Sequence, residues 1–195
     1  MNVSLEATDL ASGLNDSPAG WVDLLRYSLA GAQTGVEKVV PGHSASFGVA
    51  PQGVTTVSYF ATDAAGNEET ARTLDVKIDG APPVLTGLPA EGCTLWPANH
   101  KLQRVAVLRA SDAVSGIARG SFQVHAVSNE AMDPSDVAVT EDENGRLVVE
   151  LRAERSGDSP SGRVYRLTAT ARDLAGNEAT GTATCVVPHD RGKAK

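Results

Sequence analysis

The sequence predicts an all-β protein built from two tandem β-sandwich domains. Three observations support this prediction. Apolar residues make up 41% of the 195 residues but aromatic residues only 4%, so apolar side chains occur mostly as Val, Ala and Leu in short runs. The 19 Gly and 10 Pro residues punctuate these runs, as is typical of short strands joined by turns. Two phrases also recur in the same order along the chain, which indicates an internal duplication.

The duplication is visible in two pairs of phrases. "ATDLASG" at residues 7–13 is followed by "TDAAGNE" at residues 62–68, and "ASDAVSG" at residues 110–116 is followed by "RDLAGNE" at residues 172–178. The separation between the two phrases is nearly the same in each copy. We therefore expect one domain over residues 1–80 and a second over residues 81–190, followed by a disordered basic tail at residues 191–195.

The first domain has five apolar runs bounded by turn formers. The clearest is the last, in which Leu74, Val76 and Ile78 alternate with polar residues, as in a half-buried strand. The expected strands cover residues 2–8, 24–29, 44–49, 55–62 and 70–78. This copy is one strand short and the chain begins inside an alternating run, so we expect the sequence to be a piece of a longer polypeptide.

A Gly- and Pro-rich stretch, "DGAPPVLTGLPAEG" at residues 79–92, predicts a stiff linker between the domains. In the second domain, Asn144-Gly145 between two alternating runs is a strong hairpin signal. About seven short strands within roughly 105 residues predict an immunoglobulin-like sandwich, so the fold class is two tandem immunoglobulin-like domains. The expected strands here cover residues 101–110, 120–127, 136–140, 146–154, 163–172 and 181–187.

The two cysteines lie at opposite ends of the second domain. Cys93 follows the predicted linker, and Cys185 lies in the last apolar run. A sandwich that places its first and last strands side by side would join them in a disulfide, which would indicate an oxidising compartment. The alternative is two buried free thiols.

Charge and hydropathy exclude two classes of partner. The net charge is -7, whereas binding to nucleic acid phosphates requires a basic surface. We also expect no membrane span in this sequence, because no run approaches the roughly 20 apolar residues that cross a bilayer.

The first copy resembles bacterial immunoglobulin-like domains of secreted and cell-surface multidomain proteins, through "SLEATDLASG", "LLRYSLAG", "VSYFATDAAGNEETARTLDVKID" and "APPV". The second is similar to a related bacterial module marked by "LWPANHK", "SNEAMDPSD", "LRAERSG" and "GRVYRLTATARDLAGNEATGTATCVVPHD". The resemblance implies an extracellular or cell-surface stalk, adhesion or accessory module, joined to neighbouring domains of a longer polypeptide, and it implies no catalytic activity.

The repeated turns have two interpretations. Asp63 and Asp173 can accept hydrogen bonds from turn N–H groups while the glycines take a positive φ, which explains the repeats without any ligand. Alternatively, calcium binds where both repeated phrases meet at one end of each sandwich, because carboxylate and carbonyl oxygens suit this cation. The candidate ligands are Asp9, Asp63, Asn67 and Glu68 in the first domain and Asp112, Asp173, Asn177 and Glu178 in the second.

Two further segments carry candidate ligand-binding residues. The acidic residues of "SNEAMDPSD", at residues 128–136, are either solvated or a second cation site. In "LWPANHK", Trp96 either packs against the core or stacks on a sugar with Asn99 and His100 beside it. The segment around Ser159 looks like a serine protease nucleophile, but no other motif of that family accompanies it.

These patterns favour a non-catalytic structural or adhesive spacer of a secreted or cell-surface bacterial protein, with calcium as a stiffening ion. The alternative is a carbohydrate-binding accessory module that uses Trp96. We expect no enzyme activity, and the expected partners are an extracellular glycan or protein.

Overall fold

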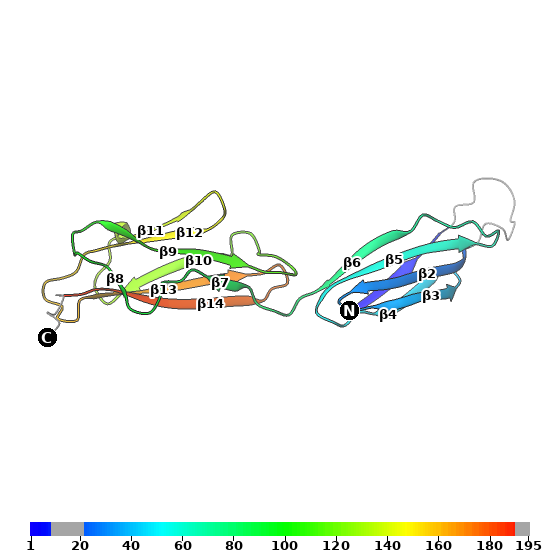
Figure 1. The fold of residues 1–195 in the computed structure, drawn as a ribbon, viewed down its shortest axis with the longest axis horizontal. Helices are drawn as coiled ribbons and strands as arrows, with labels where there is room; N and C mark the ends of the chain where they lie inside the picture. Colours follow the sequence, from blue (N-terminus) through cyan, green and yellow to red (C-terminus); the bar gives the residue numbers. More distant parts are fainter. Residues whose placement is uncertain (9–21, 190–195) are drawn as a thin grey trace. The chain divides into compact units, whose positions relative to one another are not determined.

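The computed structural model describes residues 1–8 and 22–189, and the chain forms two compact units, Met1–Gly80 and Ala81–Lys195 (Figure 1). Both units are all-β sandwiches of the immunoglobulin-like class, as the sequence predicts. The candidate ligand Asp9 and the predicted tail at residues 191–195 lie outside the described residues. Among the described residues, no helix has the length and apolar character needed to cross a membrane.

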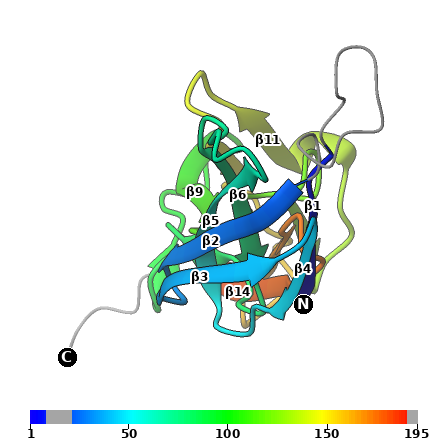
Figure 2. The ribbon, with the colours of Figure 1, turned by 90° about the vertical axis from the view of Figure 1, so that its right-hand side faces the viewer.

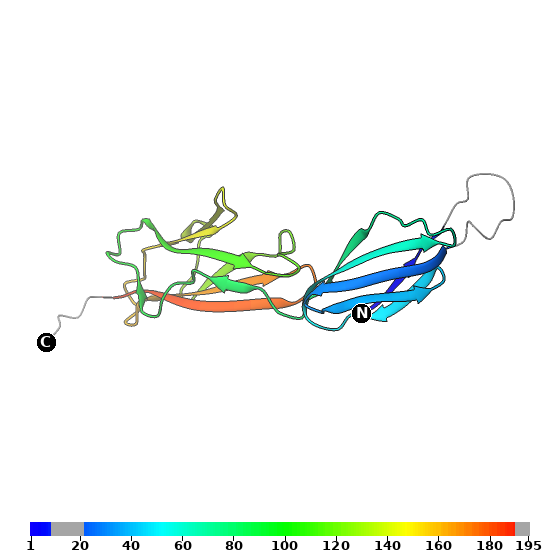
Figure 3. The same cartoon turned by 45° about the vertical axis from the view of Figure 1, so that its right-hand side comes forward.

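The first unit consists of a two-stranded sheet packed against a four-stranded sheet. Its order is β1-β4 in one sheet, shown side by side in Figure 2, and β3-β2-β5-β6 in the other, shown in Figure 3, with all pairs antiparallel. The strands are β1 (Asn2–Glu6), β2 (Val22–Gly31), β3 (Gly35–Pro41), β4 (Ser44–Gly48), β5 (Gly53–Asp63) and β6 (Arg72–Ile78).

The core of this unit lies between its two sheets and follows the alternation of the strands. Val3 and Leu5 of β1 are buried while their neighbours along the strand are exposed, and Val57 of β5 is fully buried. Each buried aliphatic side chain contributes about 1.5–3 kcal/mol relative to exposure. The core residues are Val3, Leu5, Leu25, Ala45, Val49, Val57, Ala61 and Val76.

Strand β3 was not predicted from the sequence. It is an edge strand that pairs only with β2 in the described structure, and most of its residues are exposed on both faces. Val36 is 79% exposed. Because neither face of β3 is fully buried, its sequence carries no two-residue alternation, which is the signal by which the other strands were found.

The second unit consists of two four-stranded sheets, with orders β11-β12-β9-β7 and β10-β13-β14-β8. All pairs are antiparallel except β14 with β8, which is parallel. The strands are β7 (Val84–Thr86), β8 (Cys93–Thr94), β9 (Leu102–Ser111), β10 (Gln123–Ser128), β11 (Val137–Glu141), β12 (Leu147–Arg152), β13 (Arg163–Arg172) and β14 (Glu178–Val187), with one short 3-10 helix, η2 (Pro134–Asp136).

The segment predicted as a linker belongs largely to the second unit. Strand β7 forms inside it and pairs with β9, with Leu85 opposite Ala110. Leu85 and Leu88 also pack against the core of the second unit. A strand of three residues is too short to show alternation, so the Gly and Pro residues around β7 predict a linker in its place.

The core of the second unit centres on Tyr165 rather than on a tryptophan. Tyr165 of β13 is fully buried, and its hydroxyl donates a hydrogen bond to the Arg152 carbonyl oxygen at 3.0 Å. Burial raises the pKa of Tyr165 to about 12, so the hydroxyl remains a donor at neutral pH. Leu95 is 1% exposed in this core, whereas the neighbouring Trp96 is 38% exposed.

The predicted disulfide joins Cys93 of β8 to Cys185 of β14. The two residues lie opposite one another in the parallel β8–β14 pair, with their Cα atoms 4.6 Å apart. Bridging the first and last strands of one sheet closes a loop with a sequence separation of 92 residues. In the chain-entropy account, a loop of this length contributes about 4–5 kcal/mol of stability.

Candidate functional site

Three hairpins of this protein share one turn design. The turns between β5 and β6, β11 and β12, and β13 and β14 cover residues 63–67, 142–146 and 173–177. The pairs that flank them are Thr62 with Glu68, Glu141 with Leu147 and Arg172 with Glu178. In each turn an Asp begins the loop and a Gly takes a positive φ of 90°, 70° or 97°. The sequence repeat therefore encodes a five-residue turn that occurs three times among the described residues.

In the first unit, Asp63 holds its own turn together. One carboxylate oxygen accepts hydrogen bonds from the N–H groups of Ala65 and Asn67 at 2.9 and 2.8 Å, and the other accepts one from the Asn67 side-chain amide at 2.7 Å. The Asn67 side chain and the turn N–H groups lower the pKa of Asp63 below its usual value of 3.8, so the carboxylate is charged at neutral pH.

The turn at Asp142 builds the same geometry with a different last residue. Its Oδ1 accepts from the N–H groups of Asn144 and Arg146 at 2.9 and 3.0 Å, and its Oδ2 accepts from the Arg146 guanidinium at 2.7 Å. A guanidinium thus stands where Asn67 and Asn177 stand in the other two turns. Because the turn forms equally with a cationic side chain, the Asp-x-x-Gly motif requires no metal ion.

The turn at Asp173 differs from the other two in its surroundings. Asp173 is 1% exposed, and its two oxygens accept from the Asn177 N–H and side-chain amide, both at 2.8 Å. The Asn177 amide also donates to the Ala81 carbonyl oxygen at 3.3 Å. Asp173 forms a β-bridge with Ile117, and the Leu174 N–H donates to the Gly116 oxygen at 3.0 Å, which fixes the residue 112–117 loop against this turn.

That loop brings a second carboxylate to Asp173. A carboxylate oxygen of Asp112 lies within 4.8 Å of one of Asp173. Asp112 Oδ1 accepts hydrogen bonds from the N–H groups of Val114, Ser115 and Gly116 at 3.0, 2.8 and 2.8 Å. The Gly116 N–H is the largest cause that lowers the pKa of Asp112. Both phrases of the repeat therefore meet at one end of the second sandwich.

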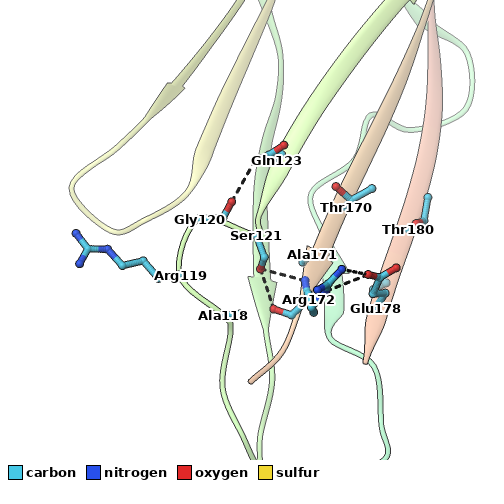
Figure 4. Close-up of a pocket in the computed structure, with 11 residues that line it drawn as sticks. Ala118, Arg119, Gly120, Ser121, Gln123, Thr170, Ala171, Arg172, Glu178 and Thr180 are labelled. Carbon is cyan, nitrogen blue, oxygen red and sulfur yellow. Dashed lines mark hydrogen bonds and ion pairs between the residues drawn. The ribbon is translucent and has the colours of Figure 1, made fainter. Parts of the chain in front are cut away.

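The donor set at this end suits a hard cation only in part. Asp112 and Asp173 are oxygen ligands of the type that calcium prefers, but two carboxylates supply at most four of the six to eight oxygens that calcium takes. Asn177 directs its amide nitrogen, not its oxygen, to Asp173. Glu178 forms an ion pair with Arg172 beside the pocket drawn in Figure 4. Of the four candidates in this unit, the structure brings only Asp112 and Asp173 together as carboxylates.

In the first unit the candidates Asp63, Asn67 and Glu68 line one surface pocket together with Glu69. Glu69 accepts a hydrogen bond from the Ala61 N–H at 3.3 Å and forms an ion pair with Arg72 at 3.7 Å. The residue expected to complete this set, Asp9, lies outside the described residues.

Arginine side chains and backbone N–H groups already bind the polar side chains of the segment at residues 128–136. Asp136 is 5% exposed, and its oxygens accept from Arg152 Nε at 2.9 Å and Arg163 Nη2 at 2.7 Å. Asn129 accepts from the Val164 N–H at 2.7 Å and so continues the β10–β13 pairing. The hypothesis of a cation site on Asp136 is wrong, because two guanidinium groups already hold its carboxylate.

The candidate sugar-binding residues lie on one exposed segment. Trp96 precedes Pro97 with a cis peptide bond, and Asn99 Oδ1 accepts a hydrogen bond from the Lys101 N–H at 3.2 Å. His100 has a φ of 63°, and its Nδ1 lies 3.2 Å from a Glu154 carboxylate oxygen. Ala98, His100 and Glu154 line a surface pocket with Arg155 and Gly157.

No family model and no curated protein matches this chain. Among solved structures it is similar to fibronectin(III)-like modules of CbhA from Clostridium thermocellum, at 13% identity and a TM-score of 0.31, with 96% of this chain and 85% of that chain covered. It is also similar to the protocadherin GammaB4 extracellular domain, at 10% identity and a TM-score of 0.39, with 83% of this chain and 26% of that chain covered. The fold assignment rests on the sheets described above, and the resemblance to bacterial repeats remains a prediction.

Proposed function

We propose that this chain is a non-catalytic structural spacer of a secreted or cell-surface protein, with two immunoglobulin-like domains in tandem between neighbouring domains of a longer polypeptide. The observation that carries the proposal is the Cys93–Cys185 disulfide, which joins the segment by which the chain enters the second unit to the strand by which it leaves. Structural disulfides persist in oxidising environments, which favours an extracellular location.

The disulfide also suits a domain that transmits tension. A pull on the two ends of the second unit first loads the pairing of β7 with β9. Once β7 detaches, the pull reaches Cys93 and Cys185, and the covalent bond carries it past the 92 residues of separation between them. Strands β9 to β14 up to Cys185 are enclosed by this bond and are then spared the load. A spacer under mechanical load benefits from this arrangement.

Single-molecule pulling on the full chain tests this role. With the disulfide intact, the second unit should not release the segment between the cysteines, and extension should come mainly from the first unit. With reductant, or in Cys93→Ser/Cys185→Ser, the released segment should add about 300 Å of contour length at about 3.5 Å per residue. Equal extension with and without reductant would contradict the proposal, and the cysteine-free first unit serves as the internal control.

Calcium is proposed as a stiffening ion of the second unit. The support is the approach of Asp112 and Asp173 to within 4.8 Å, since two carboxylates sharing a site repel one another unless a cation offsets their charge. Asp173 is also 1% exposed, so water screens its charge poorly.

A carbohydrate-binding role for Trp96 is the second candidate, because its side chain is 38% exposed, whereas Tyr165 of the same unit is fully buried. An indole face of this kind can stack on a sugar ring. In a Trp21→Phe background, tryptophan fluorescence titrated with soluble oligosaccharides should report on Trp96 alone. Trp96→Ala should abolish binding measured by calorimetry. An unchanged spectrum across the oligosaccharide panel would remove this candidate.

A further inference from the structure

The outer edge of β10 in the second unit has no strand beside it among residues 1–8 and 22–189. β10 is the first strand of the sheet β10-β13-β14-β8 and pairs only with β13. The Asn129 N–H continues this pairing and donates to the Val164 oxygen at 3.2 Å. The chain is described on both sides of β10, over residues 112–122 and 129–136, and neither segment pairs with this edge.

The pairing with β13 fixes which main-chain groups of β10 face the open edge. In an antiparallel pair, every second residue exchanges its main-chain hydrogen bonds with the neighbouring strand. Asn129 belongs to this bonded series, and so do Val127 and His125. The intervening residues have their N–H and C=O groups at the open edge; these are Val124, Ala126 and Ser128. The edge therefore offers alternating donors and acceptors in the arrangement that an added strand requires.

The first unit shows that a strand fits at this edge. Its strands β2, β5 and β6 are arranged like β10, β13 and β14 of the second unit. In the first unit, the strand after β2 is β3, and it pairs with the outer edge of β2, with Val40 opposite Leu25. In the second unit, the strand after β10 is β11, and it pairs with β12 in the other sheet. The position that β3 takes in the first unit is therefore open beside β10.

β10 also lacks the residues that usually protect an open edge. Its sequence, QVHAVS, contains no Asp, Glu, Lys, Arg or Pro. By contrast, the edge strand β3 contains Glu37, Lys38 and Pro41. Charged side chains and proline on an edge strand disfavour pairing with another chain. Val127 of β10 is 59% exposed, so an apolar side chain also lies uncovered on this strand.

The segments before and after β10 carry opposite charges. The exposed Arg119 lies in the turn before β10, and Figure 4 shows its side chain pointing away from Arg172 and Glu178. Glu130 and the exposed Asp133 follow β10. If two β10 strands lie antiparallel, the turn before one strand is beside the segment after the other, so opposite charges meet. A parallel arrangement would bring like charges together, which is unfavourable.

We propose that β10 is a self-association site, at which the β10 strands of two copies of this chain pair antiparallel about a two-fold axis. With Ala126 of the two copies opposite one another, Val124 of one copy faces Ser128 of the other. Each of these facing pairs exchanges two main-chain hydrogen bonds, so the open groups of both edges are matched. Val127 of one copy then lies opposite His125 of the other on the outer face of one continuous sheet.

The contact is small, so the dimer is weak. Stable interfaces bury about 1,200–2,000 Å², and a pair of six-residue strands buries less, so we expect association only at high micromolar to millimolar concentration. Copies that are anchored side by side reach such effective concentrations. The inference rests on β10 and its flanking segments, and it does not depend on the spacer role or on the disulfide.

Sedimentation equilibrium of the full chain, from micromolar to millimolar concentration, tests for the dimer. We expect a reversible equilibrium between monomer and dimer. Amide exchange measured by NMR should be slower at Val124, Ala126 and Ser128 in concentrated than in dilute solution. In dilute solution these amides should exchange faster than those of His125 and Val127, which donate to β13.

Two variants separate association from folding. Val127→Lys changes a side chain that is 59% exposed and places like charges of the two copies diagonally across the axis. Ala126→Pro removes an outward N–H that makes no bond to β13. Each should weaken association about 10-fold or more, and the melting temperature of the monomer verifies that it is folded. Thr182→Lys adds the same charge to the exposed outer face of β14, away from the edge, and is the matched control that should still dimerise.

A mixture of two variants provides a gain of association. His125→Glu and Val127→Lys should each dimerise poorly alone. In the mixed dimer, the introduced lysine of one copy faces the introduced glutamate of the other, and opposite charges on directly facing residues are favourable. The mixture should therefore associate more tightly than either variant by itself.

Three results would overturn the proposal. A parent protein that remains monomeric at millimolar concentration would mean that β10 is not a self-association site. Equal association in the parent protein, Val127→Lys and Ala126→Pro would mean that any contact between copies lies elsewhere. Slow amide exchange at Ala126 in dilute solution would mean that the chain covers this edge itself.

Discussion

Asp136 and Arg163 form the most enclosed ion pair among the described residues of the second unit. Asp136 is 5% exposed, and Arg163, which is 3% exposed, donates to it and stacks over the Tyr165 ring with its guanidinium carbon 4.6 Å from the ring centre. Arg152 reaches the same carboxylate and also donates to the His100 carbonyl oxygen at 2.8 Å. These bonds fasten η2 and the segment around His100 to strands β12 and β13.

Removing Asp136 should destabilise the second unit strongly. Asp136→Ala leaves the buried Arg163 guanidinium without its carboxylate, and losing one partner of a buried ion pair costs about 3–5 kcal/mol. Glu178→Gln is the matched control, because its ion pair with Arg172 is exposed and such pairs contribute at most about 1 kcal/mol. Urea unfolding followed by Trp96 fluorescence in a Trp21→Phe background measures both variants. Equal losses of unfolding free energy in the two would contradict the assignment.

The pH dependence of this contribution has a definite sign. Burial by itself raises the pKa of Asp136, but the Asp133 N–H and the Arg163 guanidinium outweigh it, so that the pKa lies below 3.8 in the folded state. Its stabilisation is therefore complete above the unfolded value and is lost as the pH falls through the lowered pKa. The parent protein should lose more stability than Asp136→Asn between neutral pH and pH 3.

At the scale of secondary-structure elements, a comparison of the five-residue hairpin turns distinguishes turn formation from cation binding. All three turns have the Asp that accepts N–H bonds and the Gly with positive φ, and at Asp173 the carboxylate of Asp112 also lies within 4.8 Å. The turn at Asp142 is therefore a natural control for the turn at Asp173 within the same unit.

Thermal unfolding in EDTA and in millimolar calcium uses this control. If calcium binds at Asp112 and Asp173, a concentration of 100 times its dissociation constant should stabilise the second unit by about 2.7 kcal/mol and raise its melting temperature by several degrees. Asp112→Asn should abolish the gain, whereas Asp142→Asn should lower the melting temperature yet retain the gain. Asp63→Asn reports in the same way on the first unit. An unchanged melting temperature in the parent protein would mean that the repeated residues form turns and do not bind calcium.

The elements that sequence patterns predict well are those with one buried face. Strand β13 occupies the predicted residues 163–172, because its alternate residues are buried from Arg163 to Ala171. The edge strand β3 and the short strands β7 and β8 bury too little to leave a two-residue period. Burial on one face is the physical origin of the pattern, so strands without it escape prediction.

Candidate site residues were harder to predict, because a residue type does not reveal its contact partner. Glu178 was conspicuous as an acid after a repeated turn, yet its side chain forms an ion pair with Arg172. No sequence pattern marks Arg152 and Arg163, because their contacts join segments up to 52 residues apart. The hydrogen bonds of Asp63 and Asp173 were predictable, because they lie within four residues of each Asp.

At the scale of the whole molecule, two copies of one domain plan have diverged in how they complete their sandwiches. In the second unit, β7 is the edge strand of the sheet β11-β12-β9-β7, and the disulfide joins β8 to β14. In the described structure of the first unit, β1 lacks a strand at the corresponding edge, and the residue corresponding to Cys185 is Val76. The two units thus share one strand plan but differ in covalent cross-linking.

The same disulfide keeps the chain joined after proteolytic cleavage of the second unit. The loop over residues 156–161 is rich in Ser and Gly and largely exposed, which makes it the kind of segment that proteases cut first. A cut there separates the chain into one piece that contains Cys93 and another that contains Cys185. Because these cysteines are bonded to each other, the two pieces remain joined. Whatever follows the second unit therefore stays attached to whatever precedes it until a reductant breaks the disulfide.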